Sequence, residues 1–168
     1  MEEKIYLRRV KETDMKLLFD WRNNELVRKN SFSMEPVEWQ EHVKWFNATL
    51  VKDSVLFFIM MCNEQEVGQI RIDLEMDNTA IIDYSIAEKY RGLGYGMQIL
   101  HLAETELYER FKNKYMLKAL VKESNMASQV LFEKLNYQIQ NNDINDYKIY
   151  VKIPVMKTSN CIPTRNSI

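Results

Sequence analysis

The 168-residue sequence has few of the residues that interrupt regular structure or build special sites. It contains four glycines, three prolines, two cysteines and two histidines. Two cysteines, Cys62 and Cys161, are too few for a disulfide framework or a cysteine-based metal cluster, and we expect no metal site. Cys62 lies within the apolar run LFFIMMC, so we interpret it as a buried thiol of the core.

The sequence also lacks an excess of either charge and a long apolar run. Its 23 basic and 24 acidic side chains give a net charge of −1, which argues against a general nucleic-acid binder. No stretch reaches the roughly 18 apolar residues of a membrane span, and the N-terminus lacks the apolar region of a signal peptide. We therefore expect one domain over residues 1–156, a polar tail over 157–168, a cytoplasmic location, and a monomer or homodimer.

What is present is a mixture of two hydrophobic periods. Helical spacing predicts helices over 12–30, 36–50, 96–114 and 125–136. In the second of these, Pro36 suits the first turn, and the expected core stripe is Trp39, Val43, Phe46 and Leu50. Alternating or continuous apolar runs predict strands over 4–10, 54–62, 67–75, 79–87, 115–121, 137–140 and 146–153. Residues 54–87 should form an antiparallel meander of three strands, and the chain as a whole a mixed α+β domain.

Three of the four glycines, Gly92, Gly94 and Gly96, lie between a predicted strand and a predicted helix. Glycine adopts positive φ and lets the backbone approach a ligand closely, and a helix N-terminus attracts anions. Lys89 and Arg91 add positive charge beside them. The cluster predicts a phosphate-binding loop; a turn needed only for packing is the alternative.

Two common phosphate loops do not fit this cluster. A P-loop requires Lys and then Ser or Thr after its last glycine, where this chain has Met97 and Gln98. A dinucleotide fingerprint requires the spacing Gly-x-Gly-x-x-Gly within a βαβ unit, whereas the preceding strand here belongs to an antiparallel meander.

The spacing Arg91-x-x-Gly94-x-Gly96 resembles the acetyl-CoA pyrophosphate loop of the GCN5-related N-acetyltransferases, the GNAT family. A second segment, NMASQVLFEKLNY, is similar to the family's Asn-x-x-Ala…Leu-Tyr-x-Lys-x-Gly-Phe helix and begins at Asn125. It matches further at Leu131, Lys134 and Leu135, with Ser128 in the place of the small residue and Phe132 in the place of the tyrosine. WRN (21–23), VR (27–28), EH (41–42) and WF (45–46) resemble the branch that contains amino-sugar-nucleotide N-acetyltransferases of pseudaminic acid biosynthesis.

The resemblance implies the GNAT fold, a mostly antiparallel sheet of about seven strands with about four helices on both faces. It implies direct transfer of an acetyl group from acetyl-CoA to a primary amine, with the backbone N–H near Ile86 supporting the oxyanion. Stabilisation of that kind is often the largest catalytic term. The positions that it implies for acetyl-CoA are Ile86, Ala87, Arg91, Gly92, Leu93, Gly94, Tyr95, Gly96, Met97, Asn125, Ser128 and Phe132.

The catalytic base and acid depart from the family pattern. Where several members have a glutamate on the fourth strand, this chain has Ile81, so Asp83 on the same strand face is the candidate base. Asp73 and Glu75 are second choices, and the alternative for Asp83 is a solvated or ion-paired strand residue. Phe132 cannot protonate the leaving thiolate. Water, Tyr137, Ser128 or the amide of Asn125 could support it instead, or it could leave unprotonated.

Residues 22–33 are rich in Arg, Lys, Asn and Ser, which suits an anionic substrate such as a nucleotide diphosphate. The candidate substrate-binding residues are Trp21, Arg22, Asn23, Arg28 and His42. Bracing of the helix pair is the alternative for Trp21 and Arg22, and a surface position without a role is the alternative for His42. Three hypotheses remain open: an amino-sugar-nucleotide N-acetyltransferase, a protein N-terminal acetyltransferase, and a catalytically silent acyl-CoA-binding module.

Overall fold

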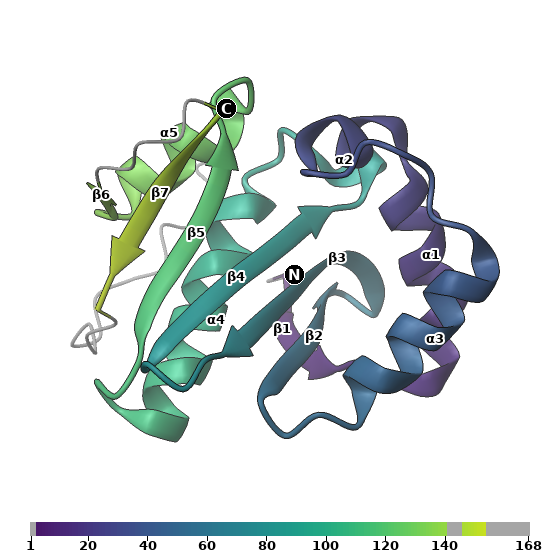
Figure 1. The fold of residues 1–168 in the computed structure, drawn as a ribbon, viewed down its shortest axis with the longest axis horizontal. Coiled ribbons are helices and arrows are strands. Elements are labelled where there is room, and N and C mark those ends of the chain that lie inside the picture. The colour runs from purple at the N-terminus through teal and green to yellow at the C-terminus, as the bar shows by residue number, and fades with distance from the viewer. Residues whose placement is uncertain (1–2, 141–145, 154–168) are drawn as a thin grey trace.

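Seven strands form one sheet in the order β1-β2-β3-β4-β5-β7-β6 (Figure 1). The computed structural model describes residues 3–140 and 146–153. Every neighbouring pair is antiparallel except β4 and β5, which are parallel. The strands are β1 (Ile5–Arg9), β2 (Val55–Cys62), β3 (Gln65–Leu74), β4 (Thr79–Ile86), β5 (Met116–Lys122), β6 (Gln138–Gln140) and β7 (Tyr147–Lys152). The predicted mixed fold and the meander of β2, β3 and β4 are confirmed.

Helices cover the sheet on both faces. Figure 1 shows α1 and α3 together on the side of the sheet nearest β1 and β2, with α2 above the end of β4, whereas α4 and α5 lie on the opposite face. The helices are α1 (Met15–Asn23), α2 (Glu25–Asn30), α3 (Trp39–Leu50), α4 (Tyr95–Phe111) and α5 (Met126–Lys134), with short 3₁₀ turns η1 (Glu12–Asp14) and η2 (Glu88–Tyr90).

Strand β2 separates two hydrophobic cores, as its continuous apolar run predicts. Phe57 and Ile59 point to the core beneath α1 and α3, where they meet Leu18 and Phe46. The alternate residues, Phe58 among them, join the larger core beneath α4 and α5. Successive side chains of a strand point to opposite faces, so burial on both faces requires an apolar residue at every position.

The single helix predicted over 12–30 is wrong, because the chain is divided at Asn24. This residue has φ −58° and ψ 135°, which ends α1, and its carbonyl then accepts from Arg28 to begin α2. Its side chain makes no capping bond to α2 and is bonded to Arg91 and Glu88 instead. The division lets the chain turn, so α2 lies across the end of β4 rather than continuing the line of α1 (Figure 1).

The second predicted helix begins later, and its buried face differs from the predicted stripe. Helix α3 starts at Trp39, three residues after Pro36. Trp39 is 42% exposed, whereas His42, Phe46 and Thr49 are its buried residues. The inward face is therefore rotated from the one that apolar residues alone indicated, because a polar histidine occupies a core position.

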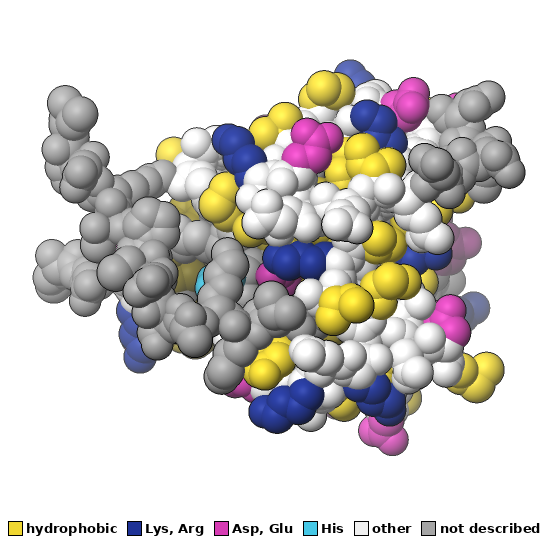
Figure 2. Space-filling model, turned by 90° about the vertical axis from the view of Figure 1, so that its left-hand side faces the viewer, with side chains coloured by type: hydrophobic (Ala, Val, Ile, Leu, Met, Phe, Trp, Pro, Cys, Tyr) yellow, Lys and Arg dark blue, Asp and Glu magenta, His cyan; other side chains and the backbone are white. Residues whose placement is uncertain are grey.

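None of the described helices is long and apolar enough to cross a membrane. Among residues 3–140 and 146–153, no group of three or more His, Cys, Asp or Glu side chains is placed to hold a metal ion. On the described part of the face in Figure 2, Lys and Arg side chains lie scattered among hydrophobic and acidic ones. The predicted tail, 157–168, lies outside the described residues.

Candidate active site

Strands β4 and β5 pair at one end only and then diverge, which leaves a gap in the sheet. The pairing joins residues 79–81 to residues 116–118, although β4 continues to Ile86 and β5 to Lys122. Figure 1 shows the two strands separating toward α2. Backbone groups along the unpaired part of β4 are therefore free of the β5 ladder, and the gap is the natural place for an extended ligand to replace a strand.

The N–H of Ile86 points toward this gap. Ala87 N donates to Val67 O over 2.8 Å, so these two residues form a hydrogen-bonded pair between β3 and β4. Hydrogen-bonded and non-hydrogen-bonded pairs alternate in an antiparallel ladder. The next pair, Ile86 with Gly68, is consequently of the second kind, and the N–H of Ile86 is directed away from β3.

The glycine cluster serves two purposes rather than one. Gly92 and Gly94 have φ of +73° and +86°, a conformation that L side chains rarely adopt, and a Cβ on either would meet no protein atom within 4 Å. Gly94 is also the N-cap of α4, so open space lies above a helix N-terminus. Gly96 differs, because its Cβ would lie 2.7 Å from Leu131 Cδ1. The packing alternative therefore holds for Gly96, while Gly92 and Gly94 fit a phosphate loop.

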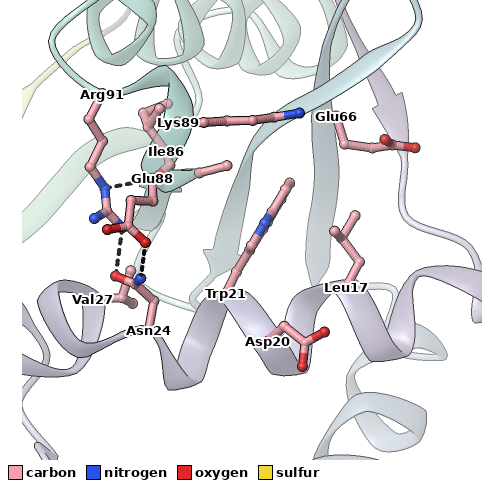
Figure 3. Close-up of a pocket in the computed structure, with 11 residues that line it drawn as sticks. Leu17, Asp20, Trp21, Asn24, Val27, Glu66, Ile86, Glu88, Lys89 and Arg91 are labelled. Atoms are coloured by element: carbon pink, nitrogen blue, oxygen red, sulfur yellow. Dashed lines mark hydrogen bonds between the residues drawn. The ribbon is translucent and has the colours of Figure 1, made fainter.

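Arg91 does not extend freely beside the glycine loop. Its Nε donates to Ile86 O over 3.0 Å and its Nη2 to Asn24 Oδ1 over 2.9 Å. Asn24 Nδ2 in turn donates to Glu88 Oε2 over 3.0 Å, as Figure 3 shows. The expectation that Arg91 simply adds charge for a phosphate is revised: its guanidinium joins the end of β4 to the division between α1 and α2.

The hydrogen bonds that join Arg91, Asn24 and Glu88 are called the Arg91 clamp below. A cavity of about 380 Å³ lies beside it, and Trp21 projects from α1 toward Lys89 and Ile86 (Figure 3). Trp21, a predicted substrate residue, therefore lines a pocket between α1 and the end of β4. In the loop itself, Leu93 is exposed and Met97 half-buried, whereas Tyr95 is buried with its hydroxyl 3.4 Å from Cys62 Sγ. The interpretation of Cys62 as a core thiol is confirmed.

The first turn of α5 faces β4 through polar groups. Asn125 is the N-cap, and its Oδ1 accepts from Ser128 N over 3.2 Å. The hydroxyl of Ser128 lies 3.0 Å from the hydroxyl of Tyr84 on β4. Phe132 is 1% exposed and contacts the ring of Tyr84 edge-on. Tyr137 packs behind Phe132, and burial raises the pKa of its phenol well above the ordinary value.

The candidate base, Asp83, lies on the other face of β4. Its side chain is 57% exposed, as the solvated or ion-paired alternative predicts. Arg71 Nη2 is 3.8 Å from Asp83 Oδ2, and Arg71 Nε donates to Asp73 over 3.0 Å. The ion-paired alternative is thus present in the structure, and a role as base stays a prediction.

Three of the predicted substrate residues brace the chain after α2. Arg22 donates to Ser33 O, Asn23 to Val37 O and Arg28 to Met34 O, over 3.1, 3.0 and 3.1 Å. These bonds hold residues 33–37 against α1 and α2. Sequence patterns gave no signal for them, because a side-chain bond to a backbone carbonyl depends on the tertiary fold.

His42 is not at a surface where it could meet a substrate. It is 2% exposed, and its ring lies among Phe19, Trp39 and Trp45. Its Nε2 lies 2.9 Å from Met15 O, a hydrogen bond in which the ring nitrogen donates. Burial lowers the pKa of His42 below 6.5. The assignment of His42 to substrate binding is therefore wrong.

The segment from α2 onward reaches across the gap to β5 and β7. Lys122 Nζ, at the end of β5, donates to Lys29 O over 3.2 Å, and Phe32 contacts Tyr147 edge-on with ring centroids 5.4 Å apart. Neither contact was predicted. Together they place α2 and its positive charges over the open end of the gap between β4 and β5.

Residues 4–138 match the family described as the acetyltransferase (GNAT) domain. The chain belongs to this family. An uncharacterized protein of Methanocaldococcus jannaschii is 28% identical over 145 residues, which is 82% of this chain and 28% of that protein. The chain thus spans little more than a quarter of the length of this curated relative.

Solved structures share the fold. A domain from M. jannaschii superposes with a TM-score of 0.79 at 24% identity, covering 90% of this chain and 99% of that one. Spermidine N-acetyltransferase from Vibrio cholerae, in complex with CoA and spermine, gives a TM-score of 0.79 at 17% identity, covering 89% and 95%. RimL, a ribosomal L7/L12 α-N-protein acetyltransferase in complex with CoA, gives 0.76 at 17%, covering 89% and 93%. The family assignment makes residues 4–138 an acetyltransferase (GNAT) domain.

Proposed function

We propose that the chain transfers the acetyl group of acetyl-CoA directly to a primary amine of an amino-sugar nucleotide. The observation that carries the acceptor half of the proposal is a set of cations on α1, α2 and the end of β5, namely Arg22, Arg28, Lys29 and Lys122. In the described part of the chain, none of the four lies within ion-pair distance of a carboxylate.

The donor half rests on the geometry of β4 and α4. The open space above Gly92 and Gly94 and the N-terminus of α4 suit the pyrophosphate of the cosubstrate. The N–H of Ile86, directed into the gap, suits a developing oxyanion or the amide-rich arm that carries the thioester. A donor that is already held in place costs little reorganisation during the reaction, which is why such groups contribute strongly to catalysis.

The acceptor half rests on charge. Burial lowers the pKa of the Arg22 guanidinium, while Asp83 opposes this and Arg28 adds to it. Nη1 of Arg22 is buried and makes no hydrogen bond to the described residues. An anionic group such as a diphosphate would be attracted by the positive charge of Arg22 and Arg28, whereas a polycationic acceptor would be repelled by it.

The test is release of CoA thiol from acetyl-CoA in the presence of a panel of amines. The panel holds a UDP-linked 4-amino sugar, spermidine, an aminoglycoside and a peptide with a free N-terminus. We expect turnover with the sugar nucleotide and a rise in its KM, with little change in kcat, for Arg28→Ala. Arg110→Ala, at the far end of α4, is the matched loss of one arginine and should leave KM unchanged.

Two outcomes would overturn the proposal. Turnover of the peptide or of spermidine without turnover of any sugar nucleotide would assign a different acceptor. Tight CoA binding without turnover of any amine would favour the silent acyl-CoA-binding module instead.

A further inference from the structure

Helix α5 departs from the family pattern at two positions, and the departures are complementary. Ser128 stands where the family motif has alanine, and Phe132 stands where it has tyrosine. Compared with the family motif, the helix has a hydroxyl at position 128 and lacks one at position 132, and these two positions are one helical turn apart. The gained hydroxyl lies 3.0 Å from the hydroxyl of a third residue, Tyr84, which carries a phenol.

Tyr84 lies on the part of β4 that borders the gap. It comes after Ile81, the last residue of β4 that pairs with β5. Tyr84 and Ile86 are two positions apart on the strand, so the side chains of these two residues point to the same face, the one covered by α4 and α5. A Cβ on Gly96 would lie 4.0 Å from Tyr84 Cε2, which places the ring beneath the first turn of α4. The phenol thus lies between the first turns of α4 and α5.

Ser128 completes the arrangement. Its backbone N–H is bonded to Asn125 Oδ1, so the cap fixes the turn, and its hydroxyl lies 3.0 Å from the phenol oxygen of Tyr84. Both residues are partly buried and keep some accessible surface. Phe132, with its ring centroid 6.0 Å from that of Tyr84, packs against the phenol ring and fixes its position.

The geometry points to Tyr84 and Ser128 as the proton donor to the departing sulfur of CoA, in place of a tyrosine on α5. The inference rests on acetyl transfer from acetyl-CoA and is independent of which amine accepts. When the amine nitrogen bonds to the carbonyl carbon, the C–S bond breaks and its electron pair remains on sulfur. The Tyr84 phenol passes its proton to sulfur, and the Ser128 hydroxyl donates a hydrogen bond to the phenolate that is left. The proton released by the amine returns through solvent to the phenolate, so the proton count is unchanged.

The protonation state of Tyr84 suits this role. Burial raises the pKa of its phenol above the ordinary value of 10.0, although the bond to Ser128 opposes the shift. The phenol therefore carries its proton at neutral and mildly alkaline pH, and it is available whenever the thiolate forms.

The first test is kinetic. With whichever amine the panel identifies, Tyr84→Phe and Ser128→Ala should each lower kcat by about 10²-fold, the lower range for general acid catalysis, with KM for acetyl-CoA unchanged. The double variant should be little worse than either single one, because the two groups act as a unit. Tyr108→Phe, near the other end of α4, removes a phenol outside the site and should not change kcat.

A hydroxyl swap separates chemistry from packing. Phe132→Tyr in the Tyr84→Phe background restores a phenol on α5 and should recover at least tenfold of the lost kcat. Failure of this rescue, or unchanged kcat in Tyr84→Phe, would overturn the inference.

The second test needs no acceptor. The thiol of bound CoA is titrated by the ultraviolet absorbance of its thiolate, in wild type and in Tyr84→Phe. A hydroxyl that donates to sulfur stabilises the thiolate, so the bound thiol should titrate at lower pH in wild type than in the variant. Identical titrations with equal CoA affinity would overturn the inference, even if the amino-sugar acceptor were correct. A shifted titration would support it even if that acceptor were wrong.

Discussion

Lys152 on β7 and Glu104 on α4 form a nearly buried ion pair. The lysine Nζ lies 2.9 and 2.7 Å from the two carboxylate oxygens, and the side chains are 12% and 10% exposed. The same Nζ donates to Leu135 O over 2.7 Å at the end of α5. One cation therefore ties together a strand and the two helices whose first turns border the gap.

Removal of the lysine should be costly for stability. Lys152→Met leaves the Glu104 carboxylate desolvated without its partner, and we expect a loss of about 3–5 kcal/mol in the free energy of unfolding. The double variant Lys152→Met with Glu104→Leu should be more stable than Lys152→Met alone, since an apolar pair replaces an unpaired charge. Urea unfolding of the three proteins measures this, and a loss below about 1 kcal/mol for Lys152→Met would show that water already solvates the pair.

Much of the fold was readable because local patterns and the final structure agree. The apolar run of β2 marked a strand buried on both faces, and Asn136, the last residue of the helix predicted over 125–136, has the φ of +62° that asparagine tolerates at a helix end. The glycines marked the loop, because Gly92 and Gly94 need positive φ whatever surrounds them. Signals of this kind depend on the residue itself and hardly on its distant neighbours.

What the sequence did not predict depends on contacts between distant elements. The division at Asn24 is held by Arg91, 67 positions away, so a helical pattern over 12–30 gave no sign of it. His42 is buried because an aromatic cage and the carbonyl of Met15 satisfy it, and neither is visible in a helical stripe. Tyr84 was missed because its partner, Ser128, is 44 positions away.

His42 should make stability depend on pH in a defined window. Burial lowers its folded-state pKa below 6.5, so the folded protein holds the neutral ring while the unfolded chain takes up a proton near pH 6.5. The contribution of the neutral ring is complete above that pH and is lost as pH falls through the folded-state pKa. Urea midpoints between about pH 8 and about pH 5.5 should fall for wild type but much less for His42→Gln, whose amide can still donate to Met15 O.

Two comparisons isolate this effect. His101→Gln, the other histidine, should retain the pH dependence of wild type. Burial raises the pKa of Asp14, but the bond from Arg8 outweighs it and the net pKa lies below 3.8, so its contribution is lost only at more acidic pH. If the urea midpoint of His42→Gln fell with pH as much as that of wild type, another group would be responsible for the pH dependence.

Replacement of Gly94 should affect CoA binding, whereas replacement of Gly96 should affect the stability of the fold. Gly94→Val strains a backbone at φ +86° and places a side chain in the open space above α4, so CoA binding should be abolished. Gly96→Ala instead places a Cβ 2.7 Å from Leu131 Cδ1, the end of a flexible side chain that can move, and helix propensity offsets part of the cost, so the loss of stability should not exceed about 1 kcal/mol.

Compensation tests the second half of this prediction. Gly96→Ala with Leu131→Ala should lose less stability than the sum of the two single changes, as measured by urea unfolding. Calorimetric titration with CoA measures the first half, and normal affinity in Gly94→Val would contradict the assignment of this loop to the pyrophosphate.

The bond between Arg91 and Asn24 predicts a coupling between the glycine loop and α2. Because Asn24 lies between α1 and α2, Asn24→Ala removes no group from the loop, yet it frees the Arg91 guanidinium that holds the end of β4. We expect Arg91→Ala and Asn24→Ala each to weaken CoA binding, and the double variant to differ from additivity by about 0.5–3 kcal/mol. Lys112→Ala, beyond the C-terminal end of α4, is a control for the loss of charge. Additive effects, or weakened binding confined to Arg91→Ala, would assign Arg91 to direct phosphate contact and not to the clamp.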